Sequence, residues 1–207
     1  MILETYTIGH SNHEFDEFIR LLGAHDIEVI ADVRSNPYSQ YNPQYNRENL
    51  RAGLESKGYQ YVFLGREFGA RRDEEECYRD GVVSYDLISQ TEAFRAGVRR
   101  MREGCAKYRV ALMCAEKDPL QCHRTILVSR HLQSGGFTVR HVLANGTLEL
   151  HTEAESRLLE EEKLVNLEFD FGEGGTKDYC KLLNEAYAAR SSKIAYKERE
   201  EVGQVPI

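Results

Sequence analysis

The sequence has no long apolar run. No stretch approaches the roughly 18 to 20 consecutive apolar residues that a membrane-spanning helix needs, and residues 1–6 lack the basic and apolar segments of a secretory signal. We therefore expect a cytoplasmic protein that has no membrane partner. The 207 residues, 41% hydrophobic and 29% charged, are typical of a globular chain with one domain and an appendage.

Disulfide and cofactor motifs are also missing. The cysteines are odd in number and irregularly spaced, which argues against a disulfide framework and favours reduced thiols. They are Cys77, Cys105, Cys114, Cys122 and Cys180. The sequence contains neither the spaced glycines of a dinucleotide or phosphate loop nor a nucleophile elbow, which argues against nicotinamide, NTP and triad-hydrolase chemistry.

An excess of basic charge is absent as well. The 27 basic and 34 acidic side chains give a formal net charge of −7, which argues against broad adhesion to nucleic acid or anionic lipid. Residues 151–207 hold 13 acidic and 8 basic side chains, and the rest of the chain holds 21 and 19. The acidity therefore belongs mainly to the C-terminal part, and the remainder could still gather arginines around one anionic ligand.

Strand-like and helix-like segments alternate along residues 1–150. Apolar runs predict strands at 5–8, 27–33, 59–64 and 110–113, with amphipathic helices between them. Segments 139–143 and 147–150 predict a terminal hairpin. This order is typical of an α/β fold with a mostly parallel sheet, helices on both faces and an antiparallel edge. We expect this domain over residues 1–165 and an acidic helical extension over 166–207.

Three helix starts carry capping patterns. Ser11 with Glu14, and Thr152 with Glu155, have the spacing of a capping box. Thr91 is expected to cap the helix that follows it.

Polar residues follow the predicted strands. In chain order these are His10 and Ser11, Asp32 and Arg34, Arg66, and the segment from Cys114 to Arg124. Parallel α/β sheets bind ligands at the carboxyl ends of their strands. We therefore expect these residues to meet at one rim of the sheet.

The densest group of reactive side chains lies in the segment 114–124. Cys114 ends a strand, and Cys122 lies in the first turn or so of a helix, beside His123 and Arg124. A helix amino terminus and nearby cations favour thiolate over thiol, so the segment predicts a reactive cysteine, with Glu116 as a further catalytic candidate. For each cysteine alone, a small buried core residue is an equally good interpretation.

The same atoms could bind a metal. Cys114, Cys122 and His123, with His10 brought in by the fold, offer sulfur and nitrogen ligands that suit zinc or iron. The spacing is not that of a zinc knuckle, and a second cysteine pair is missing. The sequence therefore favours a site without a cofactor.

Arginines offer a third interpretation. Together with a helix amino terminus, five arginines could bind phosphate or carboxylate: Arg34, Arg66, Arg71, Arg72 and Arg124. Arg71 and Arg72 precede four acidic residues, which favours ordinary ion pairing for those two. The ligand would then be a small anion such as a nucleotide, or the end of a nucleic acid.

Four further candidates have open roles. His10 could be a general base or a structural histidine, and Ser11 beside it could contact the anion. Asp32 could orient Arg34, act as a base or cap its loop. Tyr38 lies in a loop rich in tyrosine and proline, which suits either a stacking lid or a rigid solvated loop.

Several motifs resemble one known family. They are TIGHS at 7–11, DVRSNP at 32–37, YVFLG at 61–65, MCAE at 113–116 with Pro119, and CHR at 122–124. From about Thr5 to Leu159, including His151 and Glu155, the chain is similar to the domain-of-unknown-function 488 family. The resemblance implies a Rossmann-like three-layer α/β domain and leaves the activity undefined.

The resemblance also implies which residues are characteristic of the family. They fall on His10, Ser11, Asp32, Arg34, Cys114, Glu116, Cys122, His123 and Arg124. Where the family usually has Gly-Gly-Arg after the third strand, this chain has Gly69-Ala70-Arg71, which argues against a close backbone approach at position 70.

The preferred hypothesis is a cysteine-dependent enzyme that acts on a small anionic substrate, either a nucleotide or a modified base. In this hypothesis the nucleophile is Cys114 or Cys122, and His10 or His123 exchanges protons. Arg34 and Arg124 hold the anion. Sulfur transfer is a minor variant, because the six-residue active loop of rhodanese-like sulfurtransferases is missing.

The alternatives come from other classes. One is a noncatalytic nucleotide or nucleic-acid binding module associated with DNA repair, with structural cysteines. The other is a Cys/His metal-binding protein. A homo-oligomer stays open, since the tail helices could pack back on the sheet or form a dimer contact.

Overall fold

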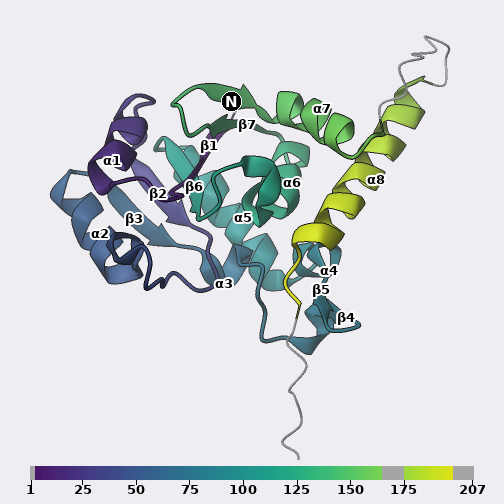
Figure 1. The fold of residues 1–207 in the computed structure, drawn as a ribbon, viewed down its shortest axis with the longest axis horizontal. Coiled ribbons are helices and arrows are strands. Elements are labelled where there is room, and N and C mark those ends of the chain that lie inside the picture. Colours follow the sequence, from purple (N-terminus) through teal and green to yellow (C-terminus); the bar gives the residue numbers. More distant parts are fainter. Residues whose placement is uncertain (1–2, 165–174, 198–207) are drawn as a thin grey trace, which may run out of the picture.

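A six-stranded sheet forms the centre of the protein. The computed structural model describes residues 3–164 and 175–197 (Figure 1). The sheet order is β3-β2-β6-β1-β7-β8, parallel throughout except for β8, which pairs antiparallel with β7. The strands are β1 (Leu3–Gly9), β2 (Val29–Asp32), β3 (Gln60–Phe63), β6 (Val110–Cys114), β7 (Phe137–Val142) and β8 (Leu148–Leu150). The predicted parallel sheet and antiparallel edge hairpin are confirmed.

Helices cover both faces of this sheet, so the molecule has the three layers of a Rossmann-like fold (Figure 1). One face packs against α1 (Phe15–Gly23) and α2 (Arg47–Ser56). The other face carries α3 (Gly65–Phe68), α4 (Tyr85–Ser89), α5 (Glu92–Cys105), α6 (Arg130–Ser134), α7 (His151–Glu161) and α8 (Gly175–Ile194). A separate two-stranded sheet is formed by β4 (Tyr78–Arg79) and β5 (Val82–Val83).

The central strand β6 is the reason why this sheet needs two helical layers. Each of its five residues, Val110 to Cys114, is buried. A strand covered on both faces reads as a continuous apolar run rather than an alternating one, and β6 lies between β1 and β2.

Of the three expected helix caps, one is present and two are absent. Thr91 Oγ1 accepts a hydrogen bond from the backbone N–H of Phe94 at 3.1 Å, as predicted. The capping box at Ser11 was wrong: α1 begins after Glu14, and Ser11 has a left-handed φ of 49°. The backbone N–H of Ser11 bonds the carbonyl of Ala115 at 2.9 Å. This long-range contact fixes Ser11 away from the extended conformation of a helix cap.

The box at Thr152 was also wrong. Helix α7 begins at His151, directly after β8, so Thr152 already lies in the first turn. Glu153 accepts the backbone N–H of Leu150 at 2.7 Å instead.

The segment after β6 is not a simple α-helix. Asp118 caps a 3₁₀ turn at Pro119–Gln121, accepting the backbone N–H of Leu120 at 3.0 Å. Cys122 is extended, and Arg124–Ser129 then forms a π-helical segment that continues into α6. Wide π turns occur often at functional sites, and this one follows directly on Cys122 and His123.

Helix α8 packs on the α/β layers. Tyr187 is buried in the shared core, and Arg190 pairs with Glu161 and Glu162 of the α7 end at 2.8 and 2.7 Å. The proposed boundary at residue 165 and parts of the expected extension over 166–207 lie outside the described residues, so the division into two parts stays a prediction. None of the helices in 3–164 and 175–197 combines the length and apolarity needed to cross a membrane.

Candidate functional site

Three adjacent strands bring the predicted polar residues to one rim. The β2-β6-β1 neighbourhood aligns Asp32 with Met113 and Gly9 with Cys114. His10 extends this pairing, its backbone N–H bonding the Cys114 carbonyl at 2.9 Å. Position 9 requires glycine for the loop after β6 to pass this close, because a Cβ there would lie 1.9 Å from the carbonyl oxygen of Glu116. The expected convergence of distant segments therefore occurs.

A cavity of about 320 Å³ opens beside this rim. Its lining joins five separate parts of the chain: Arg34, Ser35, Asn36 and Tyr38; Ala70 and Arg71; Tyr85; Cys114, Ala115, Glu116, Gln121 and His123; and Ile194 and Tyr196. The volume lies at the lower end of the range for small-molecule pockets. The cavity holds one cysteine, one histidine, one carboxyl group and two guanidinium groups.

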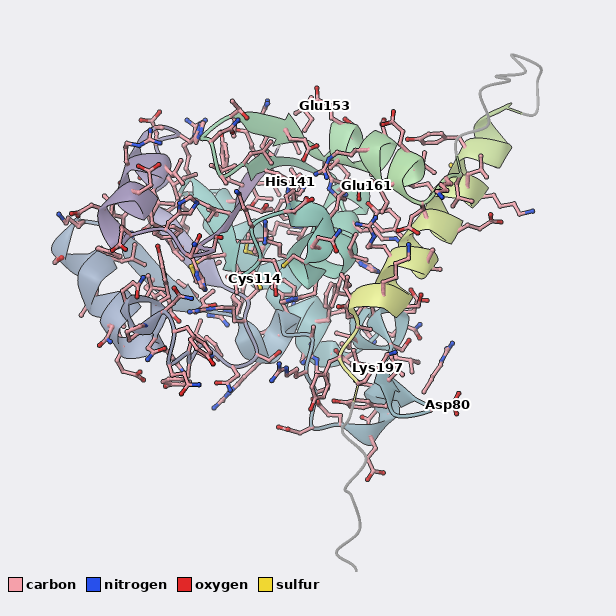
Figure 2. All side chains as sticks on the ribbon, viewed as in Figure 1. Asp80, Cys114, His141, Glu153, Glu161 and Lys197 are labelled. Carbon is pink, nitrogen blue, oxygen red and sulfur yellow. The ribbon has the colours of Figure 1, made fainter. Side chains whose placement is uncertain are left out.

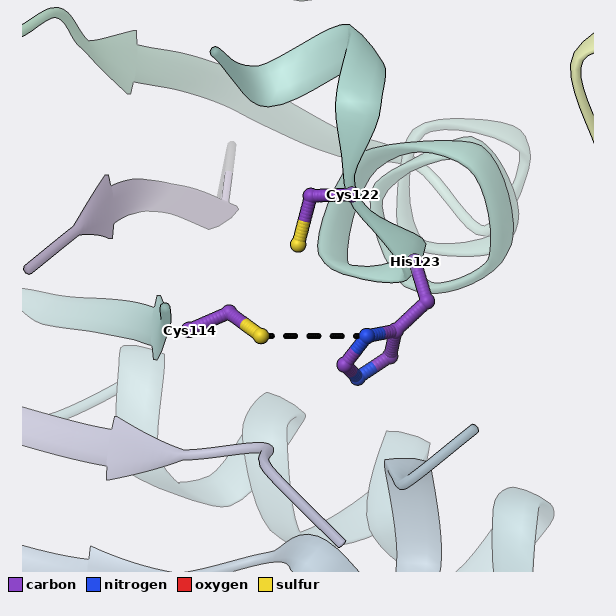
Figure 3. A group of neighbouring side chains, drawn as sticks. All are labelled: Cys114, Cys122 and His123. Carbon is purple, nitrogen blue, oxygen red and sulfur yellow. Dashed lines mark hydrogen bonds between the residues drawn. The ribbon is translucent and has the colours of Figure 1, made fainter. Parts of the chain in front are cut away.

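Cys114, Cys122 and His123 form a compact cluster at this site (Figure 3). Their ligand atoms lie within 4.8 Å of one another. Cys114 Sγ is 3.7 Å from His123 Nδ1, and His123 Nε2 is 3.0 Å from the carbonyl oxygen of Val33. Because that carbonyl only accepts, Nε2 carries a proton and Nδ1 faces the sulfur.

The pKa values of the two thiols are shifted in opposite directions. Burial opposes ionisation of Cys122, but Cys114, Arg124 and His123 outweigh it and hold the pKa of Cys122 well below that of an ordinary thiol. The backbone N–H of Arg124 also points at Cys122 Sγ, at 3.3 Å. Burial and the neighbouring Cys122 raise the pKa of Cys114. The pair therefore shares one thiolate, which titrates as a unit.

His123 and Glu116 tend to keep their protons. Burial alone would lower the pKa of His123, but Cys122 and Glu116 raise it above its usual value. Burial and Cys122 raise the pKa of Glu116. The cluster thus combines a thiolate with two proton carriers, which is the combination that cysteine nucleophiles use.

Arg34 is held in the cavity wall by Asp32. Its Nε and one terminal nitrogen donate to the two carboxylate oxygens at 2.9 and 2.7 Å, and Tyr61 donates to the same carboxylate at 2.9 Å. Of the three roles open to Asp32, the geometry shows two: it orients the Arg34 guanidinium, and it caps its loop by accepting the backbone N–H of Arg34 at 3.1 Å. Arg34 is only 7% exposed, so its charge is fixed at the rim rather than mobile.

His10 is engaged on both ring nitrogens. Nδ1 lies 2.8 Å from the carbonyl of Ser11, and Nε2 lies 3.2 Å from the Arg34 guanidinium, which must donate. The ring stacks on Tyr45 with 4.1 Å between centroids. Burial and Arg34 lower the pKa of His10 to about 4. His10 is thus a neutral support for Arg34, and it does not line the cavity.

The side chain of Arg124 forms hydrogen bonds with the backbone of the loop after β6. It is fully buried and donates to the carbonyls of Glu116 and Lys117 at 2.7 and 3.3 Å. It thereby shapes the loop after β6 and supplies positive charge behind Cys122, but it is not part of the cavity lining.

The other predicted anion contacts divide between the cavity and elsewhere. Tyr38 lines the cavity and is 53% exposed. Arg66 borders a different hollow, with Arg47 and Arg100, and Ser11 bonds Asn12.

Sequence reasoning missed Arg71 and Tyr196 as lining residues. Ion pairing was favoured for Arg71 and Arg72, yet no ion pair within 3–164 and 175–197 includes either residue. Arg72 donates to backbone carbonyls of Arg66 and Glu67. The Arg-Ser-Asn run after β2 could have indicated Ser35 and Asn36, whereas nothing local indicates Tyr196.

The cluster also has the chemistry of a metal site. Two thiols and one imidazole suit zinc, and the Val33 carbonyl would hold the ring of His123 in the way that metal-binding histidines are held. His10, the fourth ligand considered from the sequence, is not in the group. A metal here would keep one position open toward the cavity.

Fold and site together define a Rossmann-like α/β protein with a Cys-Cys-His cluster at the strand ends. A family model described as "Domain of unknown function DUF488" matches residues 14–131, more than half of the chain. The chain belongs to this family, as its motifs indicated. No curated protein and no solved structure matches.

Proposed function

We propose that the protein is a cysteine-dependent enzyme for a small anionic substrate, with Cys114 as the nucleophile. The observation that carries this proposal is the position of Cys114. It alone of the two clustered cysteines lines the cavity, 3.7 Å from His123 Nδ1. Both side chains are buried, at 3% and 1% exposure, so the position of Cys114 in the cavity lining separates it from Cys122.

The acidities assign the remaining roles. As Cys114 attacks an electrophilic atom of the substrate, its proton passes to the Cys122 thiolate, which Arg124 and His123 stabilise. Glu116, whose pKa is raised, then donates a proton to the leaving group. Arg34 and Arg71 hold the anionic part of the substrate in the same cavity. A nucleotide or modified base is the finer form of this proposal.

Alkylation of the native protein tests the nucleophile. Iodoacetamide is added between pH 6 and 8, and mass mapping follows all five cysteines separately. Cys180 is exposed and serves as the ordinary thiol in the same chain, whereas burial raises the pKa of Cys105 to about 11. We expect Cys114 to react about tenfold faster than Cys180 at pH 6.5, because the thiolate that it shares with Cys122 forms below the pH at which an ordinary thiol ionises, and Cys114 is the member of the pair that lines the cavity.

Two variants separate the sulfurs. Cys114→Ser should remove the fast site, and Cys122→Ser should slow Cys114 because its proton acceptor is lost. If Cys180 outpaces both clustered cysteines in the wild-type protein, the enzyme proposal fails.

A zinc site is the second candidate, favoured by the three ligand atoms within 4.8 Å. Elemental analysis of the purified protein should then find one equivalent of metal, and a chelator should accelerate the alkylation of Cys114. Protein that contains no metal, and whose alkylation rate is unchanged by added zinc, would exclude this candidate.

A further inference from the structure

The C-terminal end of α8 forms part of the cavity wall. Ile194 and Tyr196 both line it. The carbonyl of Tyr196 accepts the backbone N–H of Val83 at 2.9 Å, and Lys197 forms an antiparallel bridge with Val82. Residues 196–197 therefore lie against β5, near the label of Lys197 in Figure 2.

Helix α8 is fixed relative to the reactive cysteines. Arg190 is only 4% exposed and donates to Glu161 and Glu162. It also donates to the carbonyl of Leu120 at 3.2 Å. Leu120 precedes Gln121, a cavity residue, and Cys122. The wall and the cluster are thus held by one set of contacts, although α8 lies outside the matched range 14–131.

Tyr196 lies beside an available cation. The guanidinium of Arg71 lies 4.7 Å from the centre of the Tyr196 ring, while the backbone N–H of Arg71 bonds Ser35 Oγ at 2.8 Å. Arg71 takes part in no ion pair in the described part of the chain. The cavity therefore offers an aromatic ring next to a positive charge that forms no ion pair with the carboxylates of residues 3–164 and 175–197.

We propose that Tyr196 is a specificity-determining residue and that the substrate joins an anionic group to a planar aromatic ring. This inference rests on the proposed function, since it assigns the substrate class of the same site. The anionic group binds Arg71 and Arg34, and the ring packs on Tyr196, with Tyr38 as a second aromatic side chain in the lining.

Calorimetric titration with two probes tests this pairing without any need for a reactive thiol. Inorganic phosphate reports the anion site alone, and phenyl phosphate adds a ring. We expect phenyl phosphate to bind the wild-type protein about five- to tenfold more tightly than phosphate, the gain expected from one stacked ring. Tyr196→Leu should remove this gain and leave the Kd of phosphate unchanged, whereas Tyr196→Phe should keep it.

Matched variants keep the result interpretable. Tyr108→Leu removes a 40% exposed tyrosine that borders a different hollow, and it should change neither Kd. Arg71→Gln should weaken both probes by about threefold, and thermal melting checks that each variant is folded.

The possible results distinguish this inference from the proposed function. Equal affinities of the two probes for the wild-type protein, a gain that survives Tyr196→Leu, or no binding of either probe would overturn the inference. Fast alkylation of Cys114 alongside such a result would leave the enzyme proposal standing. Slow alkylation alongside a gain that depends on Tyr196 would overturn the enzyme proposal and support the inference.

Discussion

Two buried clusters of the protein contain histidine, and they differ in what the imidazoles face. Figure 2 labels one residue of each, Cys114 and His141, both inside the molecule. In the first cluster, His123 faces two sulfurs beside a cavity with two arginines. In the second, the histidines face only hydroxyl groups, a carboxyl group and each other.

The second cluster is a continuous hydrogen-bonded chain across four elements. Thr7 Oγ1 lies 2.8 Å from His141 Nδ1, His141 Nε2 lies 3.0 Å from His151 Nδ1, and His151 Nε2 lies 3.0 Å from the Tyr187 hydroxyl. Tyr187 donates to Glu155 at 2.9 Å. The chain links β1, β7, α7 and α8, and it does not border the cavity beside Cys114.

The pKa values of the histidines in the two clusters are shifted in opposite directions. Burial lowers the pKa of His151 to about 4, and burial with His151 lowers that of His141. The pKa of His123 is raised. The hydrogen-bonded chain therefore holds two histidines neutral between β1, β7, α7 and α8, whereas the neighbouring Cys122 and Glu116 favour the protonated form of His123. Burial of a histidine alone does not separate these roles; its partners do.

The largest predicted effect concerns the cavity cluster. His123→Gln keeps a donor for the Val33 carbonyl but removes the imidazole beside the sulfurs, so alkylation of Cys114 at pH 7 should slow by about 100-fold. His151→Gln, a matched change in the other cluster, should leave that rate unchanged. The measurement is the iodoacetamide rate by mass mapping. Equal slowing by both variants would mean that the clusters do not differ in function.

The second prediction concerns acid stability. Because the folded pKa of His151 lies below its unfolded value of 6.5, its contribution is complete above pH 6.5 and is lost as the pH falls toward 4. For each buried neutral histidine, the free energy of unfolding should fall by about 1.4 kcal/mol for each unit by which the pH is lowered through this window. His10 and His141 act in the same direction, whereas His123 acts in the opposite one. Urea denaturation at pH 7, 6 and 5 measures the slope.

Two variants of the closed chain isolate this effect. His151→Gln should flatten the slope by about 1.4 kcal/mol per pH unit. Tyr187→Phe breaks the chain but keeps both imidazoles, so it should lower stability by about 1–2 kcal/mol at pH 7 with little change of slope. A slope that His151→Gln leaves intact would assign the acid sensitivity to other groups.

Patterns local to the sequence predicted the fold and half of the site. The strand ends could be predicted because apolar runs stop at Asp32 and Cys114, and parallel pairing then brings them together. The roles of Arg124 could not be predicted. The sequence shows a cation next to Cys122, but it does not show that the Arg124 guanidinium bonds the carbonyls of Glu116 and Lys117.

Long-range contacts account for the remaining differences. The pairing of Ser11 with Ala115 overrides a local capping pattern. The position of Arg71 depends on Tyr196, which is 125 residues later in the chain. A sequence read in local windows favours the acidic residues next to Arg71 as its partners, whereas folding supplies an aromatic ring instead.

The smallest predicted effect concerns the charge of the cavity. Iodoacetate carries a negative charge that iodoacetamide lacks. The rate of alkylation of Cys114 by iodoacetate, divided by its rate with iodoacetamide, therefore reports the electrostatic field of Arg34 and Arg71. Arg71→Gln should lower this ratio by about threefold at low salt, the size expected for one partly solvated charge several ångströms away. The difference should shrink as ionic strength rises, because an exposed guanidinium is screened.

Arg79→Gln is the matched control, since Arg79 is also exposed but borders another hollow. Both variants change the net charge equally, so a general field of the protein would lower the ratio equally in both. A drop confined to Arg71→Gln would show that the positive charge acts from within the cavity. No drop in either variant would leave Arg34 as the anion holder, and the cavity cluster would then differ from the closed histidine chain by its thiols and its two buried arginines, Arg34 and Arg124.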